Sequence, residues 1–147
     1  MKGGRQLPRE DARRRIRGVG LRATPGRIAT YQVLFSAAAP LTHGDVVELL
    51  AGLGLDRATV YRNLIDLTEG GLVARSDLGD HAWRFEIAHQ PADRASREHV
   101  HFVCIDCGDV ACLSGVDVSI RKAEGIPRSV SEKRVEVQLR GRCDECS

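Results

Sequence analysis

The 147-residue sequence predicts an α+β fold, with an N-terminal winged helix-turn-helix followed by a small C-terminal α/β domain. Three observations predict it. Helical segments with clear start signals precede a hairpin pattern, residues 88–98 are polar without periodicity, and all five cysteines lie after residue 103. We therefore expect a first domain over residues 1–87, a hinge linker over 88–98 and a second domain over 99–147.

Local signals indicate where the helices of the first domain begin. Thr24 suits an N-cap and Pro25 the first helical position, Thr42 and Asp45 form a variant capping box, and Asp56 is again an N-cap. Glycines end the predicted helices at residues 9–17, 42–50 and 56–70. We predict a short basic helix over residues 9–17, and helices from Pro25 to about Ala38, from Thr42 to Leu50 and from Asp56 to Gly70.

Strand patterns complete both domains. Leu72–Ser76 and Ala82–Ile87 flank a turn at residues 78–80 and predict a hairpin. The second domain has only about 50 residues, so we expect a metal or a partner chain to support its small core. Its predicted elements are strands at Val100–Cys104, Asp109–Leu113 and Arg134–Leu139, and a helix at Val116–Glu124.

The charges divide unequally along the chain. Residues 1–62 hold eleven Lys or Arg against five Asp or Glu, a net charge of +6, and the remainder holds eleven against fifteen, a net charge of −4. A nucleic-acid-binding module joined to another domain would give this division, as would a solvated basic arm.

No apolar run predicts a membrane span or a secretory signal, so we expect a cytoplasmic protein without a membrane partner.

Four cysteines have the spacing of a metal site. Cys104 and Cys107 form one Cys-x-x-Cys pair, and Cys143 and Cys146 form another, 35 residues further on. Two such pairs complete a tetrahedral thiolate shell, which predicts a structural Zn²⁺ site. Two disulfides or inert thiols are the alternatives, and a cytosolic location disfavours stable disulfides.

A second group of possible metal ligands lies around the linker. On a strand, His99 and His101 would project from the same face, and Cys112 belongs to no Cys-x-x-Cys pair. Glu86 and His81 belong to the predicted hairpin. Imidazole, carboxylate and thiolate groups together predict a second divalent metal, and an ion shared by both domains would fix the angle between them. Each of these residues also has an alternative interpretation without a metal: Cys112 as a core residue, Glu86 as a solvated carboxylate and His81 as a turn residue.

The chain resembles the ferric uptake regulator family of bacterial metal-dependent repressors over roughly residues 12–146. The segments that carry the resemblance are Gly20–Arg27, Ala58–Leu64, His99–Gly108 and Gly141–Cys146. The resemblance implies a homodimer, with residues 99–147 as a dimerisation and metal-binding domain. It also implies a structural zinc, a regulatory metal at the hinge, and repression of uptake or stress genes through an AT-rich palindromic operator.

The helix predicted from Asp56 to Gly70 is expected to contact DNA. Its apolar face holds Val60, Leu64 and Leu67, and the resemblance places base contacts on Tyr61 and Arg62. Arg62 can bind guanine with two hydrogen bonds, and Tyr61 can touch a thymine methyl group or a phosphate. The resemblance assigns Arg22 to the minor groove. The remaining predicted DNA-binding residues are Arg57 and Thr59, with phosphate contacts also from residues 9–17.

Departures from the family pattern bear on the sensed metal. Pro40 replaces the hinge histidine of the family, and Cys112 replaces an acidic ligand of the regulatory site. The family's further, variable metal site falls on residues that mostly cannot coordinate, so we expect two metals per chain; they are Glu98, Val100, Ser119 and Val135. A thiolate favours Zn²⁺ over Fe²⁺ or Mn²⁺, which predicts a regulator of zinc uptake. The peroxide-sensing branch would need Asp in place of Glu86. Two alternatives come from other classes of protein: a constitutive architectural protein and a metalloenzyme. No general base and no pocket for a small organic substrate are evident in the sequence, so we expect that the protein is not an enzyme.

Overall fold

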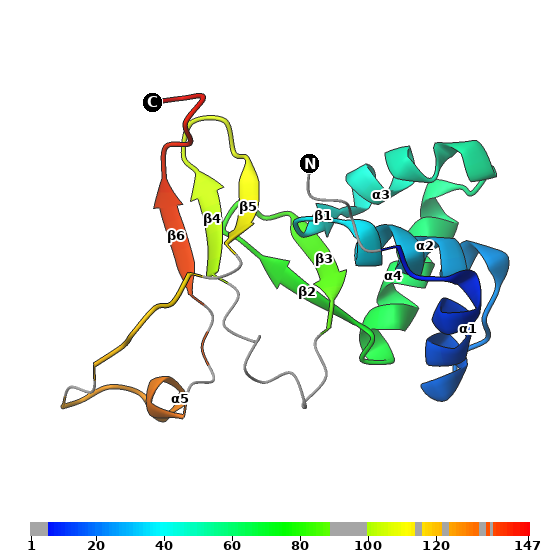
Figure 1. The fold of residues 1–147 in the computed structure, drawn as a ribbon, viewed down its shortest axis with the longest axis horizontal. Coiled ribbons are helices and arrows are strands. Elements are labelled where there is room, and N and C mark those ends of the chain that lie inside the picture. Colours follow the sequence, from blue (N-terminus) through cyan, green and yellow to red (C-terminus); the bar gives the residue numbers. More distant parts are fainter. Residues whose placement is uncertain (1–5, 89–99, 114–115, 122–123, 133–134, 136) are drawn as a thin grey trace. The chain divides into compact units, whose positions relative to one another are not determined.

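The computed structural model describes residues 6–88, 100–113, 116–121, 124–132, 135 and 137–147 (Figure 1). The chain divides into two compact units, Met1–His89 (unit 1) and Gln90–Ser147 (unit 2). Each unit has its own small sheet, and unit 1 holds most of the helices, so the fold class is α+β as predicted. No helix in the described part of the chain is long and apolar enough to cross a membrane.

Unit 1 has the helices and the hairpin of a winged helix-turn-helix. In chain order the elements are α1 (Arg9–Gly18), α2 (Pro25–Ser36), β1 (Leu41–Thr42), α3 (His43–Leu49), a 3₁₀ turn (Ala51–Leu53), α4 (Arg57–Glu69), β2 (Val73–Asp77) and β3 (Trp83–Ile87) (Figure 1). The predicted segments agree with α1, α2, α3, α4, β2 and β3 to within a few residues. The short strand β1 was not predicted.

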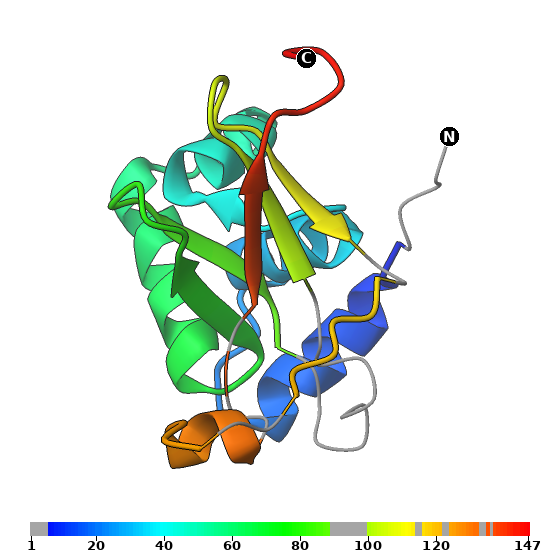
Figure 2. The ribbon, with the colours of Figure 1, turned by 90° about the vertical axis from the view of Figure 1, so that its left-hand side faces the viewer.

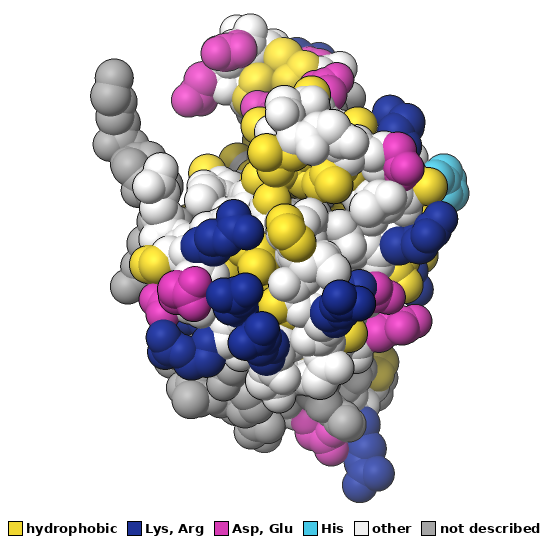
Figure 3. Space-filling view, turned by 90° about the vertical axis from the view of Figure 1, so that its right-hand side faces the viewer, with side chains coloured by type: hydrophobic (Ala, Val, Ile, Leu, Met, Phe, Trp, Pro, Cys, Tyr) yellow, Lys and Arg dark blue, Asp and Glu magenta, His cyan; other side chains and the backbone are white. Residues whose placement is uncertain are grey.

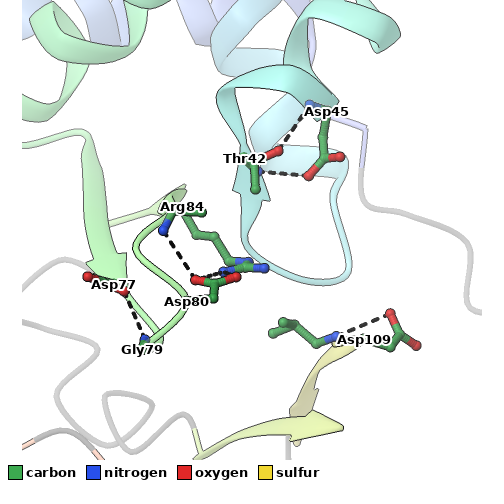
Figure 4. A network of polar contacts seen from close by, with 9 residues as sticks. Thr42, Asp45, Asp77, Gly79, Asp80, Arg84 and Asp109 are labelled. Carbon is green, nitrogen blue, oxygen red and sulfur yellow. Dashed lines mark hydrogen bonds and ion pairs between the residues drawn. The ribbon is translucent and has the colours of Figure 1, made fainter. Parts of the chain in front are cut away.

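Side-chain caps explain why three of these helices begin where they do. The Thr24 hydroxyl accepts a hydrogen bond from the Arg27 amide at 3.2 Å, and an Asp56 carboxylate oxygen accepts one from the Thr59 amide at 2.6 Å. At the start of α3 the capping box is complete, because Thr42 Oγ1 accepts from the Asp45 amide and the Asp45 carboxylate accepts from the Thr42 amide (Figure 4). These bonds satisfy amides that a helix leaves without partners at its first turn.

The core of unit 1 lies between α2, α4 and the sheet. Ile28 and Tyr31 of α2, Leu64 of α4 and Phe85 of β3 are all fully buried or nearly so. Each buried side chain of this size contributes about 1.5–3 kcal/mol through the hydrophobic effect. The packing therefore fixes the inner face of α4 and leaves its outer face toward solvent.

The sheet of unit 1 attaches the hairpin to the helices. Its strand order is β1-β3-β2, with antiparallel pairing throughout. Phe85 of β3 lies opposite both Leu41 of β1 and Arg75 of β2. Because β1 leads directly into α3, the hairpin, or wing, is joined to the helix-turn-helix through main-chain hydrogen bonds.

Unit 2 contains a three-stranded sheet with a mixed pattern. Its strands are β4 (Val100–Cys104), β5 (Val110–Leu113) and β6 (Gln138–Gly141), in the order β5-β4-β6 (Figure 2). β5 is antiparallel to β4, whereas β6 is parallel to it. A short helix, α5 (Arg128–Ser131), precedes β6.

Two predictions for unit 2 were wrong. The described residues within Val116–Glu124 are not helical, which agrees with the low helix propensity of Val116, Val118 and Ile120. The predicted strand Arg134–Leu139 starts only at Gln138 and continues to Gly141, where it pairs with β4. Of the predicted linker, only Ala88 is among the described residues.

Candidate metal centre and nucleic-acid interface

The four cysteines of the two pairs come together at one end of the sheet in unit 2. Cys104 is the last residue of β4, and Cys143 follows the end of β6 by two residues. Because β4 and β6 are parallel, with Cys104 opposite Gly141, both strands deliver their cysteine pair to the same edge. Gly108, at φ +74°, follows the first pair in a backbone conformation that favours glycine.

The spacing of these sulfur atoms fits a tetrahedral metal. All four Sγ atoms lie within 4.8 Å of one another, and Cys107 Sγ is 3.8 Å from Cys143 Sγ. Zn–S bonds of about 2.3 Å in a tetrahedron place the sulfurs about 3.8 Å apart. A disulfide needs a separation of about 2.05 Å, so this pair of atoms has the distance of two ligands rather than of a bond.

The ionisation of the cluster also suits a cation. Hydrogen bonds from the backbone amides of Cys107 and Cys143 lower the pKa of Cys104 to about 6. The Cys143 amide is 3.4 Å from Cys104 Sγ. In contrast, the neighbouring thiols of Cys143 and Cys107 raise the pKa of Cys146 to about 12. The backbone thus favours the thiolate of Cys104, whereas the raised pKa of Cys146 means that its thiolate is favoured only beside a cation.

Two of the residues predicted for a second metal are neighbours across the sheet of unit 2. His101 of β4 lies directly opposite Cys112 of β5 in the antiparallel register. Opposite residues in such a pair project from the same face, with Cβ atoms about 4.5–5.5 Å apart. His101 is 2% exposed and Cys112 is half-buried. His99 lies outside the described residues.

The other two predicted ligands belong to the wing of unit 1. Glu86 is half-buried near the end of β3, and His81 is exposed in the turn before this strand, with φ +60°. Asp80 holds this turn, because its carboxylate accepts from Arg84 Nη1 at 2.8 Å and from the Ala82 amide at 3.3 Å (Figure 4). The Arg84 hydrogen bond lowers the pKa of Asp80. His81 and Glu86 therefore stand at opposite ends of β3.

The outer face of α4 presents polar side chains to solvent. Tyr61 is 45% exposed, Arg57 and Arg62 are exposed, and Thr59 is half-buried. Arg22 is exposed in the loop before α2. The side chains of Tyr61 and Arg62 point to solvent because Val60, Leu64 and Leu67 on the opposite face of α4 are buried.

A basic helix adds positive charge to unit 1. α1 carries five arginines, of which Arg13 and Arg14 form ion pairs with Glu10 and Asp11. Figure 3 views the molecule from the side of α1 and shows Lys and Arg side chains gathered on this face. Such a surface suits the phosphates of a nucleic acid.

Sequence reasoning missed two residues that support the outer face of α4. The Arg27 guanidinium donates to the Arg22 carbonyl oxygen at 2.7 Å and forms an ion pair with Asp66 of α4. His43 Nε2 lies 2.8 Å from the Arg57 carbonyl oxygen. The capping motif Thr24-Pro25-Gly26-Arg27 could have drawn attention to Arg27, whereas no local pattern marks His43.

A winged helix-turn-helix unit, followed along the chain by a unit with a four-cysteine cluster that could hold a metal ion, is typical of metal-dependent regulators. The family model for the Ferric uptake regulator family matches residues 18–139. The Peroxide operon regulator of Bacillus subtilis (strain 168) is 32% identical over 143 residues, which cover 94% of this chain and 92% of that protein. The chain therefore belongs to the Ferric uptake regulator family, as the sequence motifs indicated, and its members are transcription regulators.

Solved structures share the fold. The crystal structure of the Vibrio cholerae ferric uptake regulator matches with a TM-score of 0.65 at 23% identity, covering 90% of this chain and all of that chain. A Zinc Uptake Regulator complexed with zinc and DNA matches with a TM-score of 0.57 at 21% identity, covering 94% of this chain and 91% of that chain. The family thus includes proteins named for iron, zinc and peroxide, and membership alone leaves the signal open.

Proposed function

We propose that this chain is a zinc-responsive transcriptional repressor that binds operator DNA as a homodimer. The observation that carries the proposal is the outer face of α4. Tyr61 and Arg62 point to solvent, while the opposite face of the helix is fixed in the core. A recognition helix needs this arrangement, because its side chains must reach base edges in the major groove.

The predicted DNA-binding residues of unit 1 have different roles in the proposed complex. Arg62 would bind guanine O6 and N7, and Tyr61 would touch a thymine methyl group or a phosphate. Arg22 would enter the minor groove, which is narrow and strongly negative in AT-rich DNA. Arg57 and Thr59, together with the arginines of α1, would contact phosphates. A dimer would read two half-sites and hence a palindrome.

The two metal sets have different roles in this proposal. The cluster of Cys104, Cys107, Cys143 and Cys146 would hold a structural Zn²⁺, which is supported by the 3.8 Å sulfur separation. The regulatory Zn²⁺ would be bound by His99, His101 and Cys112, with either Glu86 or His81 as a further ligand, since these two stand at opposite ends of β3. The thiol of Cys112 beside His101 supports zinc, since Fe²⁺ and Mn²⁺ prefer nitrogen and oxygen ligands.

A second candidate signal is peroxide, sensed through iron. The identity of 32% to the Peroxide operon regulator of Bacillus subtilis favours this candidate. The two candidates differ in whether Cys112 is a ligand. Without the thiolate, the remaining imidazole and carboxylate groups would suit iron as well as zinc.

The test compares metals on the full chain and on Cys112→Ser. Elemental analysis should find two zinc ions per wild-type chain and one after mild chelation, and specific DNA binding should depend on the second ion. In Cys112→Ser we expect the structural ion to remain and the zinc-dependent DNA binding to weaken. Equal activation of both proteins by Fe²⁺ would favour the iron candidate. Specific DNA binding that persists when only the structural ion remains would indicate an architectural protein instead.

A further inference from the structure

His43 connects the two helices of the helix-turn-helix at the proposed DNA-binding face. It is the first residue of α3, and its Nε2 lies 2.8 Å from the carbonyl oxygen of Arg57, the first residue of α4. A carbonyl only accepts hydrogen bonds, so Nε2 carries the hydrogen. The imidazole therefore donates across the turn to the start of the proposed recognition helix.

The same imidazole contacts the side chain of Tyr61. The two ring centroids are 5.4 Å apart with an interplanar angle of 68°, which is an edge-to-face arrangement. Aromatic rings prefer this geometry because the positive edge of one ring meets the negative face of the other. Tyr61 contacts His43 through this ring pair and is still 45% exposed, so part of its side chain stays open to solvent.

We propose that His43 is a positioning residue for DNA recognition, which rests on the proposed function. Its hydrogen bond holds the first turn of α4, and its ring restricts the rotamers of Tyr61 before DNA arrives. A side chain that is ordered in advance loses less conformational entropy on binding. Deleting the imidazole should therefore weaken binding through Tyr61, although His43 itself need not touch a base.

A purely structural role predicts a different outcome. The start of α3 is already capped by Thr42 and Asp45, and α4 by Asp56. These caps do not involve the imidazole, so unit 1 should stay folded without it. If His43 only stabilised the fold, its deletion would weaken DNA binding equally whether or not Tyr61 is present.

The experiment is a double-mutant cycle in the metal-loaded full chain with His43→Ala, Tyr61→Ala and the double variant. The probe is a duplex selected from a randomised pool by the wild-type chain, with a scrambled duplex for comparison. We expect His43→Ala to weaken binding of the selected duplex about two- to tenfold, the usual size of an aromatic pair. In the Tyr61→Ala background, the additional His43→Ala substitution should change the affinity little. His43→Phe, which keeps a ring, should retain part of the wild-type affinity.

A readout without DNA separates positioning from recognition. The chain has only two tyrosines, and Tyr31 is buried in the core. His43→Ala should shift the ring resonances of Tyr61 in NMR spectra and leave those of Tyr31 in place. Equal losses of affinity in both backgrounds, or unchanged Tyr61 resonances, would overturn the inference. Full affinity of Tyr61→Ala would also overturn it, because His43 would then position no contact with DNA. Failure of the wild-type chain to select any duplex would instead overturn the proposed function.

Discussion

Removing the metal from the four-cysteine cluster should unfold unit 2 and spare unit 1. Among the described residues, unit 2 buries only Val100, Val103 and Cys104 as apolar side chains. The two valines contribute about 3–6 kcal/mol in total, from about 1.5–3 kcal/mol each. The apolar core alone is therefore a weak source of stability for this unit.

The cost of ordering the sheet shows what the metal must supply. The three strands contain five, four and four residues, and fixing each backbone costs about 1–2 kcal/mol, hence roughly 13–26 kcal/mol in total. Structural zinc in small domains binds with about 10–16 kcal/mol. Together with the two valines it supplies roughly 13–22 kcal/mol, which is close to the cost.

Amide hydrogen exchange measures whether the sheet of unit 2 stays folded without the metal. After chelation, verified by elemental analysis, the amides of β4 and β6 should lose their protection, while those of α2 and α4 keep theirs. Cys143→Ser should behave like the chelated protein. Cys112→Ser is the matched control, because the fifth cysteine lies outside the cluster and its loss should leave β4 and β6 protected. Full protection of β4 and β6 in verified metal-free protein would refute the reasoning.

Three further predictions concern unit 1. Leu64→Ala, at a position with no exposed surface, should lower the free energy of unfolding by about 2–5 kcal/mol in denaturant titrations, whereas Leu53→Ala, 60% exposed, should change it by less than about 0.5 kcal/mol. Hydrogen bonds from Thr59 lower the pKa of Asp56, so the carboxylate stabilises α4 above its unfolded pKa of 3.8 and this contribution disappears as the pH falls through the lower folded pKa. Asp56→Asn should keep the cap and reduce the loss of helical circular dichroism in acid titrations; an unchanged titration would contradict this role. Arg62→Ala should cost about 1–3 kcal/mol on the selected duplex, measured by titration, and relax specificity at one base pair, whereas a uniform loss on all duplexes would indicate a phosphate contact.

The starts of α2, α3 and α4 were predictable because each depends on residues three positions apart. Thr24, Thr42 and Asp56 accept hydrogen bonds from amides in the following turn, so the information is local in the sequence. The same holds for the inner face of α4, whose apolar spacing matches the helical repeat. The expected helix at Val116–Glu124 was wrong, since its β-branched residues favour extended backbone over the helical pattern assumed there.

The candidate metal site likewise has a part that could be predicted from the sequence and a part that could not. Each Cys-x-x-Cys pair is a local feature, and the sequence by itself determined that four thiols were available for one ion. Only the tertiary structure decided how they meet, because the parallel pairing of β4 with β6 joins residues 37 positions apart in the sequence, such as Cys104 and Gly141. The contact of His43 with Arg57 and Tyr61 is likewise tertiary, since it depends on how α3 packs against α4. The spacing of apolar residues in the sequence does not determine that packing.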